Sequence, residues 1–192
     1  EVERWLARLV RKANDVPGAA AVNESRWKRL GPVTEGQRAG REALALYQSI
    51  NTAESLNKAA ALAEDMLAKL PAGRPATIAG WTVLDTYERR NDWAKANLAG
   101  NKLLQKSPPT TPYHLQSLHI HMADNYSRLG QRTNAVASLK KALEVPNAPD
   151  RPDLLARLIT ELYQTGAKPA ELEPLVADYT KKYPNRNDRF TL

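Results

Sequence analysis

The chain has 192 residues, a net charge of +7 at neutral pH and no cysteine. This length allows one large or two small domains with a sizeable hydrophobic core. The lack of cysteine excludes a disulfide framework, a thiolate nucleophile and a metal site with cysteine ligands, and no apolar run is long enough to span a bilayer. The basic charge permits nucleic acid or an anionic membrane as a partner, but lysine and arginine also solubilise helix surfaces.

The segments between glycine and proline are rich in good helix formers, which predicts an all-α chain. Residues 1–13 place their apolar side chains on one helical face and their basic ones largely off it, and the sequence NDVPG then ends this predicted helix. A second short helix with Val22, Trp27 and Leu30 is expected to stop at Gly31 and Pro32. We expect residues 1–33 to be a helical pair that caps one end of the fold, and we rank membrane contact through residues 1–13 below this role.

The next helices have candidate caps. Thr34 and Gln37 have the spacing of a capping box, and Asn51 with Glu54 is expected to start the following helix. That helix runs to Leu70, and the sequence PAGRP after it indicates a linker.

A tyrosine, a short polar break and a closing proline recur together along the rest of the chain. Tyr87, Tyr126 and Tyr163 lie 39 and 37 residues apart, and a proline follows each at 20 or 21 residues, namely Pro108, Pro146 and Pro184. The breaks read ERRND, SRLGQ and QTGA, and each opens a second helix. This pattern indicates a helical-hairpin repeat with insertions in the linkers.

The residues of the middle unit match the order of a known repeat: His119, Met122, Ala123, Tyr126, Ala135, Leu139, Ala142 and Pro146. The alanines allow two antiparallel helices to approach closely, while Tyr126 fills the groove beside them. This order resembles the tetratricopeptide repeat, whose period is about 34 residues. The resemblance implies antiparallel hairpins stacked into a right-handed α-solenoid with a concave wall of first helices. An irregular antiparallel bundle is the alternative fold.

The neighbouring units match less closely. Large residues replace expected small ones at Leu84, Thr160, Leu172 and Tyr179, which predicts wider packing, and Pro174 suggests that the last helix begins nearer Glu173. We divide residues 34–184 into four hairpins and leave a polar tail; these ranges are 34–72, 73–108, 109–147, 148–184 and 185–192.

The resemblance places the residue two before each tyrosine on the concave wall, and all three of these residues are acidic: Asp85, Asp124 and Glu161. With neighbours on the same helices, the predicted partner-binding groove comprises Trp81, Asp85, Asp124, Arg128, Arg157 and Glu161. Ordinary solvated helix residues are the alternative interpretation. The lysine and asparagine set with which family members hold a C-terminal carboxylate is missing at the matching positions, so we do not expect binding of that kind.

No catalytic motif was found, and we expect neither an enzyme, nor a cofactor, nor a metal site. His119 and His121 point apart on a helix, and His119 occupies a packing position. Basic side chains fall on predicted second helices, hence on the convex side: Lys95, Lys102, Lys106, Arg132, Lys140, Lys141, Lys181 and Lys182. Because no nucleic-acid motif accompanies them, a solvated face is the preferred interpretation.

The sequence therefore predicts a non-enzymatic scaffold that binds a protein or peptide in a concave groove. The alternatives are a structural repeat region of a larger cell-envelope or secretion assembly and, ranked lower, a basic nucleic-acid-binding array. The compartment stays open between cytoplasm and, if a signal sequence was removed, periplasm.

Overall fold

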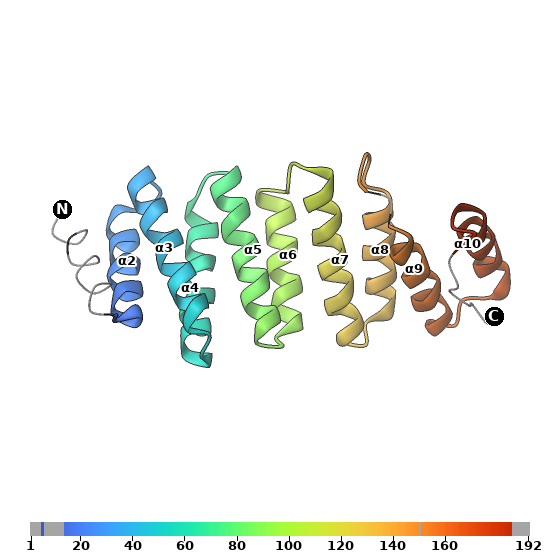
Figure 1. Ribbon diagram of the computed structural model, residues 1–192, viewed down its shortest axis with the longest axis horizontal. Coiled ribbons are helices and arrows are strands. Elements are labelled where there is room, and N and C mark those ends of the chain that lie inside the picture. Colours follow the sequence, from blue (N-terminus) through green and yellow to red (C-terminus); the bar gives the residue numbers. More distant parts are fainter. Residues whose placement is uncertain (1–4, 6–13, 150, 186–192) are drawn as a thin grey trace. The chain divides into compact units, whose positions relative to one another are not determined.

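The computed structural model describes residues 5, 14–149 and 151–185 (Figure 1). Within these ranges the chain forms α-helices joined by turns, without a strand. The predicted all-α fold is thus confirmed. Apart from Trp5, which is exposed, the helix predicted over residues 1–13 lies outside the described residues, as does the tail after Asn185.

The chain divides into two compact units, Glu1–Pro108 and Pro109–Leu192. The first contains α2 (Val16–Leu30), α3 (Thr34–Ile50), α4 (Ala53–Lys69), α5 (Arg74–Arg89) and α6 (Trp93–Lys106). The second contains α7 (Pro112–Arg128), α8 (Arg132–Leu143), α9 (Pro152–Gln164) and α10 (Pro169–Lys182). In each unit consecutive helices pack against each other, and α3 also contacts α5 (Figure 1).

The ends of α2 follow from its sequence. The Asp15 side chain accepts a hydrogen bond from the Gly18 amide at 2.9 Å, and Pro17 occupies the first turn, where its missing N–H is not needed. Gly31 ends the helix at a φ of 66°, a conformation that favours glycine. The predicted stop at Gly31 and Pro32 is confirmed.

Two predicted caps are each wrong by one residue. Val33 is the N-cap of α3 and makes no side-chain cap bond, because valine has no polar side-chain atom, while the Gln37 side-chain amide donates to the Pro32 carbonyl at 2.6 Å. Asn51 ends α3 in the left-handed region, and Thr52 forms the capping box of α4 with Ser55. Asn51 tolerates this conformation better than most residues, so the helix can end and the next begin with almost no linker.

The last helix begins at Pro169, so the predicted start near Glu173 is also wrong. Pro174 lies inside α10. A proline at this position removes one helical hydrogen bond, that to the carbonyl of Ala170. Ala170 and Pro174 are both exposed, so water can satisfy the carbonyl.

The cores contain the expected small residues at helix crossings. Ala123, Ala135 and Ala142 are fully buried. Of the large residues predicted to widen the packing, Leu84, Leu172 and Tyr179 are buried and Thr160 is exposed. The tyrosines differ: Tyr47 and Tyr87 are buried, Tyr126 is half-buried, and 57% of the Tyr163 surface is exposed.

Candidate functional site

In the first unit, Asp85 links two first helices. The Gln48 side-chain amide on α3 donates to Asp85 Oδ2 on α5 at 3.0 Å. The Arg89 guanidinium, one turn further along α5, pairs with the same oxygen at 2.9 Å. The Asp85 side chain remains 42% exposed, so the carboxylate is partly accessible to solvent.

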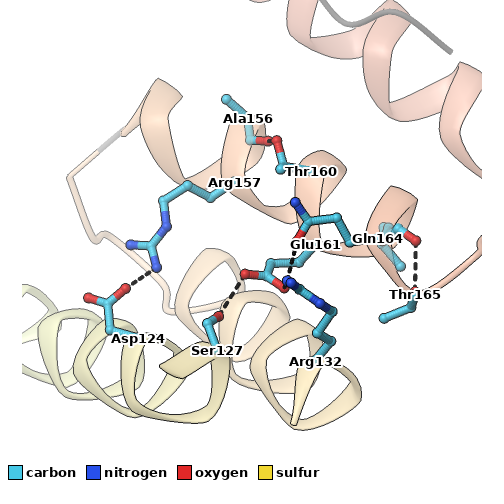
Figure 2. Close-up of polar contacts among 10 residues, drawn as sticks. Asp124, Ser127, Arg132, Ala156, Arg157, Thr160, Glu161, Gln164 and Thr165 are labelled. Carbon is cyan, nitrogen blue, oxygen red and sulfur yellow. Dashed lines mark hydrogen bonds and ion pairs between the residues drawn. The ribbon is translucent and has the colours of Figure 1, made fainter. Parts of the chain in front are cut away.

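In the second unit, Glu161 links α9 to the preceding hairpin (Figure 2). The Ser127 hydroxyl on α7 donates to Glu161 Oε1 at 2.6 Å, and Arg132 Nη1 on α8 pairs with Oε2 at 3.0 Å. Arg132 also donates to Gln164. Only 13% of the Glu161 side chain is exposed, so this carboxylate mainly joins helices.

This placement corrects one prediction, since Arg132 was expected on the solvated convex side. It is the first residue of α8, beside the turn from α7, and its long side chain reaches α9 (Figure 2).

Another ion pair in this unit directly joins the two first helices, α7 and α9. Arg157 Nη2 on α9 donates to Asp124 Oδ1 on α7 (Figure 2). The two side chains are 34% and 45% exposed, respectively. Solvent screens such a pair, so it contributes little to stability but presents a donor and an acceptor together at the surface.

Both units use the same register for these contacts. The residue after the tyrosine of one hairpin donates to the acid two before the tyrosine of the next: Gln48 to Asp85, and Ser127 to Glu161. Sequence analysis singled out the acids but missed both donors. Both donors directly follow a tyrosine, so considering the residue after each tyrosine would have identified them.

The other two predicted groove residues lie on the same first helices. Trp81 is half-buried on α5, one turn before Asp85. Arg128 is exposed at the end of α7, one turn after Asp124. The structure therefore places Trp81 and Asp85 in the first unit and brings Asp124 and Arg157 into direct contact in the second.

A tyrosine–glutamate hydrogen bond recurs in the first unit. The Tyr47 hydroxyl donates to Glu24 at 2.6 Å and the Tyr87 hydroxyl to Glu64 at 3.0 Å, and both pairs are 23 residues apart. Burial is the main cause that raises the pKa of both tyrosines, and the hydrogen bond to the glutamate adds to it. The pKa of Tyr87 rises to about 12. The positions 23 residues before Tyr126 and Tyr163 hold leucine and lysine, so these two tyrosines lack this acceptor.

No protein-family model and no curated protein matches the sequence. Several solved structures are similar in fold. A putative kinesin light chain from Podosopora anserina with nearly identical TPR-like repeats has 14% identity and a TM-score of 0.60, with 97% of this chain and 96% of that chain covered. MamA 41-end from Desulfovibrio magneticus RS-1 has 8% identity and a TM-score of 0.57, with 97% and 96% covered. PilW, a type IV pilus biogenesis factor, has 15% identity and a TM-score of 0.53, with 97% and 94% covered.

The chain has the tetratricopeptide-like fold. This confirms the resemblance inferred from the tyrosine, break and proline pattern. In the terms of that fold, α3 and α5 are first helices in one unit, and α7 and α9 are first helices in the other. The division into hairpins at 34–72, 73–108, 109–147 and 148–184 stays a prediction, although each range contains two helices.

Two of the three histidines, His114 and His119, occupy different environments. His114 is exposed and contacts the Thr111 hydroxyl at 2.7 Å, while His119 is buried, as predicted, and its Nδ1 makes no hydrogen bond. In the described part of the chain, no three His, Cys, Asp or Glu side chains are grouped so that they could hold a metal ion. No described helix has the length and apolar character needed to cross a bilayer.

His119 should make the stability of the fold sensitive to acid. Its burial and then the nearby Lys141 charge lower its pKa from 6.5, so the folded state disfavours a proton that the unfolded chain accepts. The free energy of unfolding should therefore fall as the pH drops below 6.5, by at most about 1.4 kcal/mol per pH unit for this proton. Urea unfolding between pH 7.5 and 5.5 measures this slope.

The matched variant is His119→Leu, which keeps a packing side chain. His119→Leu should flatten the slope over this range. Equal slopes for His119→Leu and the wild type would contradict the assignment to His119.

Proposed function

We propose that the chain is a non-enzymatic protein-interaction scaffold that binds a protein or peptide segment along the faces of its first helices. The tetratricopeptide-like fold supports this role, because it exposes rows of first helices to which an extended segment or a helix can dock. The binding residues we propose are those predicted from the sequence, with Glu161 in a supporting position because most of its side chain is buried.

The observation that carries the proposal is the half-exposed Asp124–Arg157 pair. A carboxylate and a guanidinium held side by side between two first helices can accept from and donate to a bound polypeptide without rearrangement. Asp85, 42% exposed between Gln48 and Arg89, offers a similar polar position in the first unit. Such contacts set specificity and orientation more than raw affinity.

A charge exchange tests this surface without removing the ion pair. In the variant Asp124→Arg with Arg157→Asp, the pair is kept but its polarity is inverted, so the fold should retain its stability within about 1 kcal/mol. We expect partners captured by the wild-type chain from an extract of the native host to be lost by this variant. Mass spectrometry of the captured proteins and a urea unfolding curve measure the two quantities.

The control inverts a comparable exposed pair on a second helix of the same unit, Asp178→Lys with Lys182→Asp, whose atoms lie 2.9 Å apart. This variant should capture the same partners as the wild type. If the first-helix exchange leaves capture unchanged, the proposed face is wrong.

The same capture experiment addresses the alternatives. If phosphate contacts caused the binding, it would be lost between low and moderate salt, which would favour a nucleic-acid-binding array. Capture of only cell-envelope or secretion components, insensitive to the charge exchange, would favour a structural repeat region of a larger assembly.

A further inference from the structure

A second surface lies in the first unit, away from the predicted groove residues. Helices α4, α5 and α6 line an open groove with a cavity of about 380 Å³. Its lining residues are Glu64, Leu67, Ala68, Val83, Lys102, Gln105 and Lys106. This volume is within the range of about 300–1,000 Å³ found for ligand pockets.

The floor of the groove is apolar and its rim is mostly basic. Leu67 and Val83 are buried beneath it. On the α6 side, Lys106 Nζ donates to the Ala68 carbonyl at 2.6 Å, whereas Lys102 is exposed and makes no ion pair with any described residue. On the α4 side, Glu64 accepts the Tyr87 hydroxyl at 3.0 Å.

We propose that this groove binds an acidic peptide segment of a partner protein, with one apolar side chain of the segment seated on Leu67 and Val83. Lys102 and Lys106 supply two positive charges beside the apolar floor, against the single carboxylate of Glu64. Carboxylates flanking an apolar residue match this arrangement in both charge and polarity. The site is independent of the first-helix faces, because six of its seven lining residues, including its whole rim, lie on the second helices α4 and α6.

The second unit contains a counterpart that differs in charge. A cavity of about 620 Å³ lies among α8, α9 and α10, and its lining includes Lys140, Leu143 and Glu144. These residues follow Glu64, Leu67 and Ala68 by 76 residues, the spacing that also separates Tyr87 from Tyr163. A glutamate, the C-cap residue of α8, thus stands in the second unit where Ala68 stands in the first, and Ala68 is exposed, so we expect α4 to accommodate Ala68→Glu.

The test uses a fluorescently labelled peptide of aspartate and glutamate with one central phenylalanine, titrated with the whole chain at low ionic strength. The affinity for the peptide should be at least about tenfold lower in Ala68→Glu and in Lys102→Glu than in the wild type. Glu64→Gln should strengthen it, because this change removes the opposing charge and keeps an acceptor for Tyr87. The matched control is Ala61→Glu, at an exposed position of the same helix.

Fluorescence anisotropy gives the affinities, and thermal unfolding of each variant shows that the helices remain folded. The proposal is overturned if the wild type does not bind the peptide, if Ala68→Glu and Ala61→Glu bind it equally, or if Glu64→Gln binds more weakly. A peptide with serine in place of phenylalanine should also bind more weakly than the original. Equal affinity would show a purely ionic contact and would overturn the apolar anchor.

Discussion

Replacing Trp27 by alanine should lower the free energy of unfolding of the first unit by about 3–5 kcal/mol. Trp27 is fully buried on α2, and its indole Nε1 donates to Asp65 Oδ2 on α4 at 2.7 Å. It also borders α3, because a Cβ added at Gly40 would lie 3.4 Å from Trp27 Cδ2. One side chain therefore joins three helices, and its loss leaves a large cavity and removes one hydrogen bond from Asp65, which still pairs with Lys69.

The variant Trp27→Phe separates these two losses. It retains most of the apolar volume but removes the indole donor, so we expect a smaller loss of stability than for alanine. Urea unfolding followed by circular dichroism measures both variants, since it does not depend on tryptophan fluorescence. Because the chain has two compact units, the curve should be fitted for two transitions, with only the first unit affected. Equal losses for phenylalanine and alanine would contradict a packing role for the ring.

The fold was predictable because its signals are periodic. Each tyrosine, polar break and proline marks one hairpin, and small residues such as Ala123, Ala135 and Ala142 mark the crossings where helices approach. Single helix ends were less predictable, because several residues near a break can cap a helix. Gln37 bonds to the Pro32 carbonyl rather than to a cap at Thr34, and Ser55 pairs with Thr52. Competition among such local bonds decides the end residue.

The candidate groove was predictable in position but not in its contacts. The repeat register alone identifies the acids before each tyrosine. Their partners depend on side chains one hairpin away, such as Arg157 for Asp124, 33 residues apart. The tyrosines themselves differ for a comparable reason. Tyr47 and Tyr87 each donate to a glutamate 23 residues earlier, whereas the residues 23 before Tyr126 and Tyr163 are leucine and lysine. The sequence pattern gives the place of each residue in the hairpin, and the neighbouring hairpin decides its environment.

The tight turn between α2 and α3 leads to the second large effect, expected for Gly36→Ala. A Cβ at Gly36 would lie 2.1 Å from the Gly31 carbonyl oxygen and 3.1 Å from Leu30 Cβ. The obstacle is backbone, which cannot rotate away as a side chain can. Alanine inside a helix normally gains about 0.5–1 kcal/mol over glycine. The displaced backbone should outweigh this gain, for a net loss of about 2 kcal/mol or more in the free energy of unfolding.

Gly40→Ala, one turn further along α3, is the matched control. Its added Cβ would meet Met66 Sδ at 2.7 Å and Cε at 2.8 Å, which are the far end of a flexible side chain. We expect Met66 to move aside, so that this variant changes stability by less than about 1 kcal/mol in either direction. Urea unfolding of both variants measures the difference. Equal stability of the two variants would mean that the backbone of the α2–α3 turn shifts as easily as a methionine side chain. The close approach of the helices at Gly36 would then not require glycine.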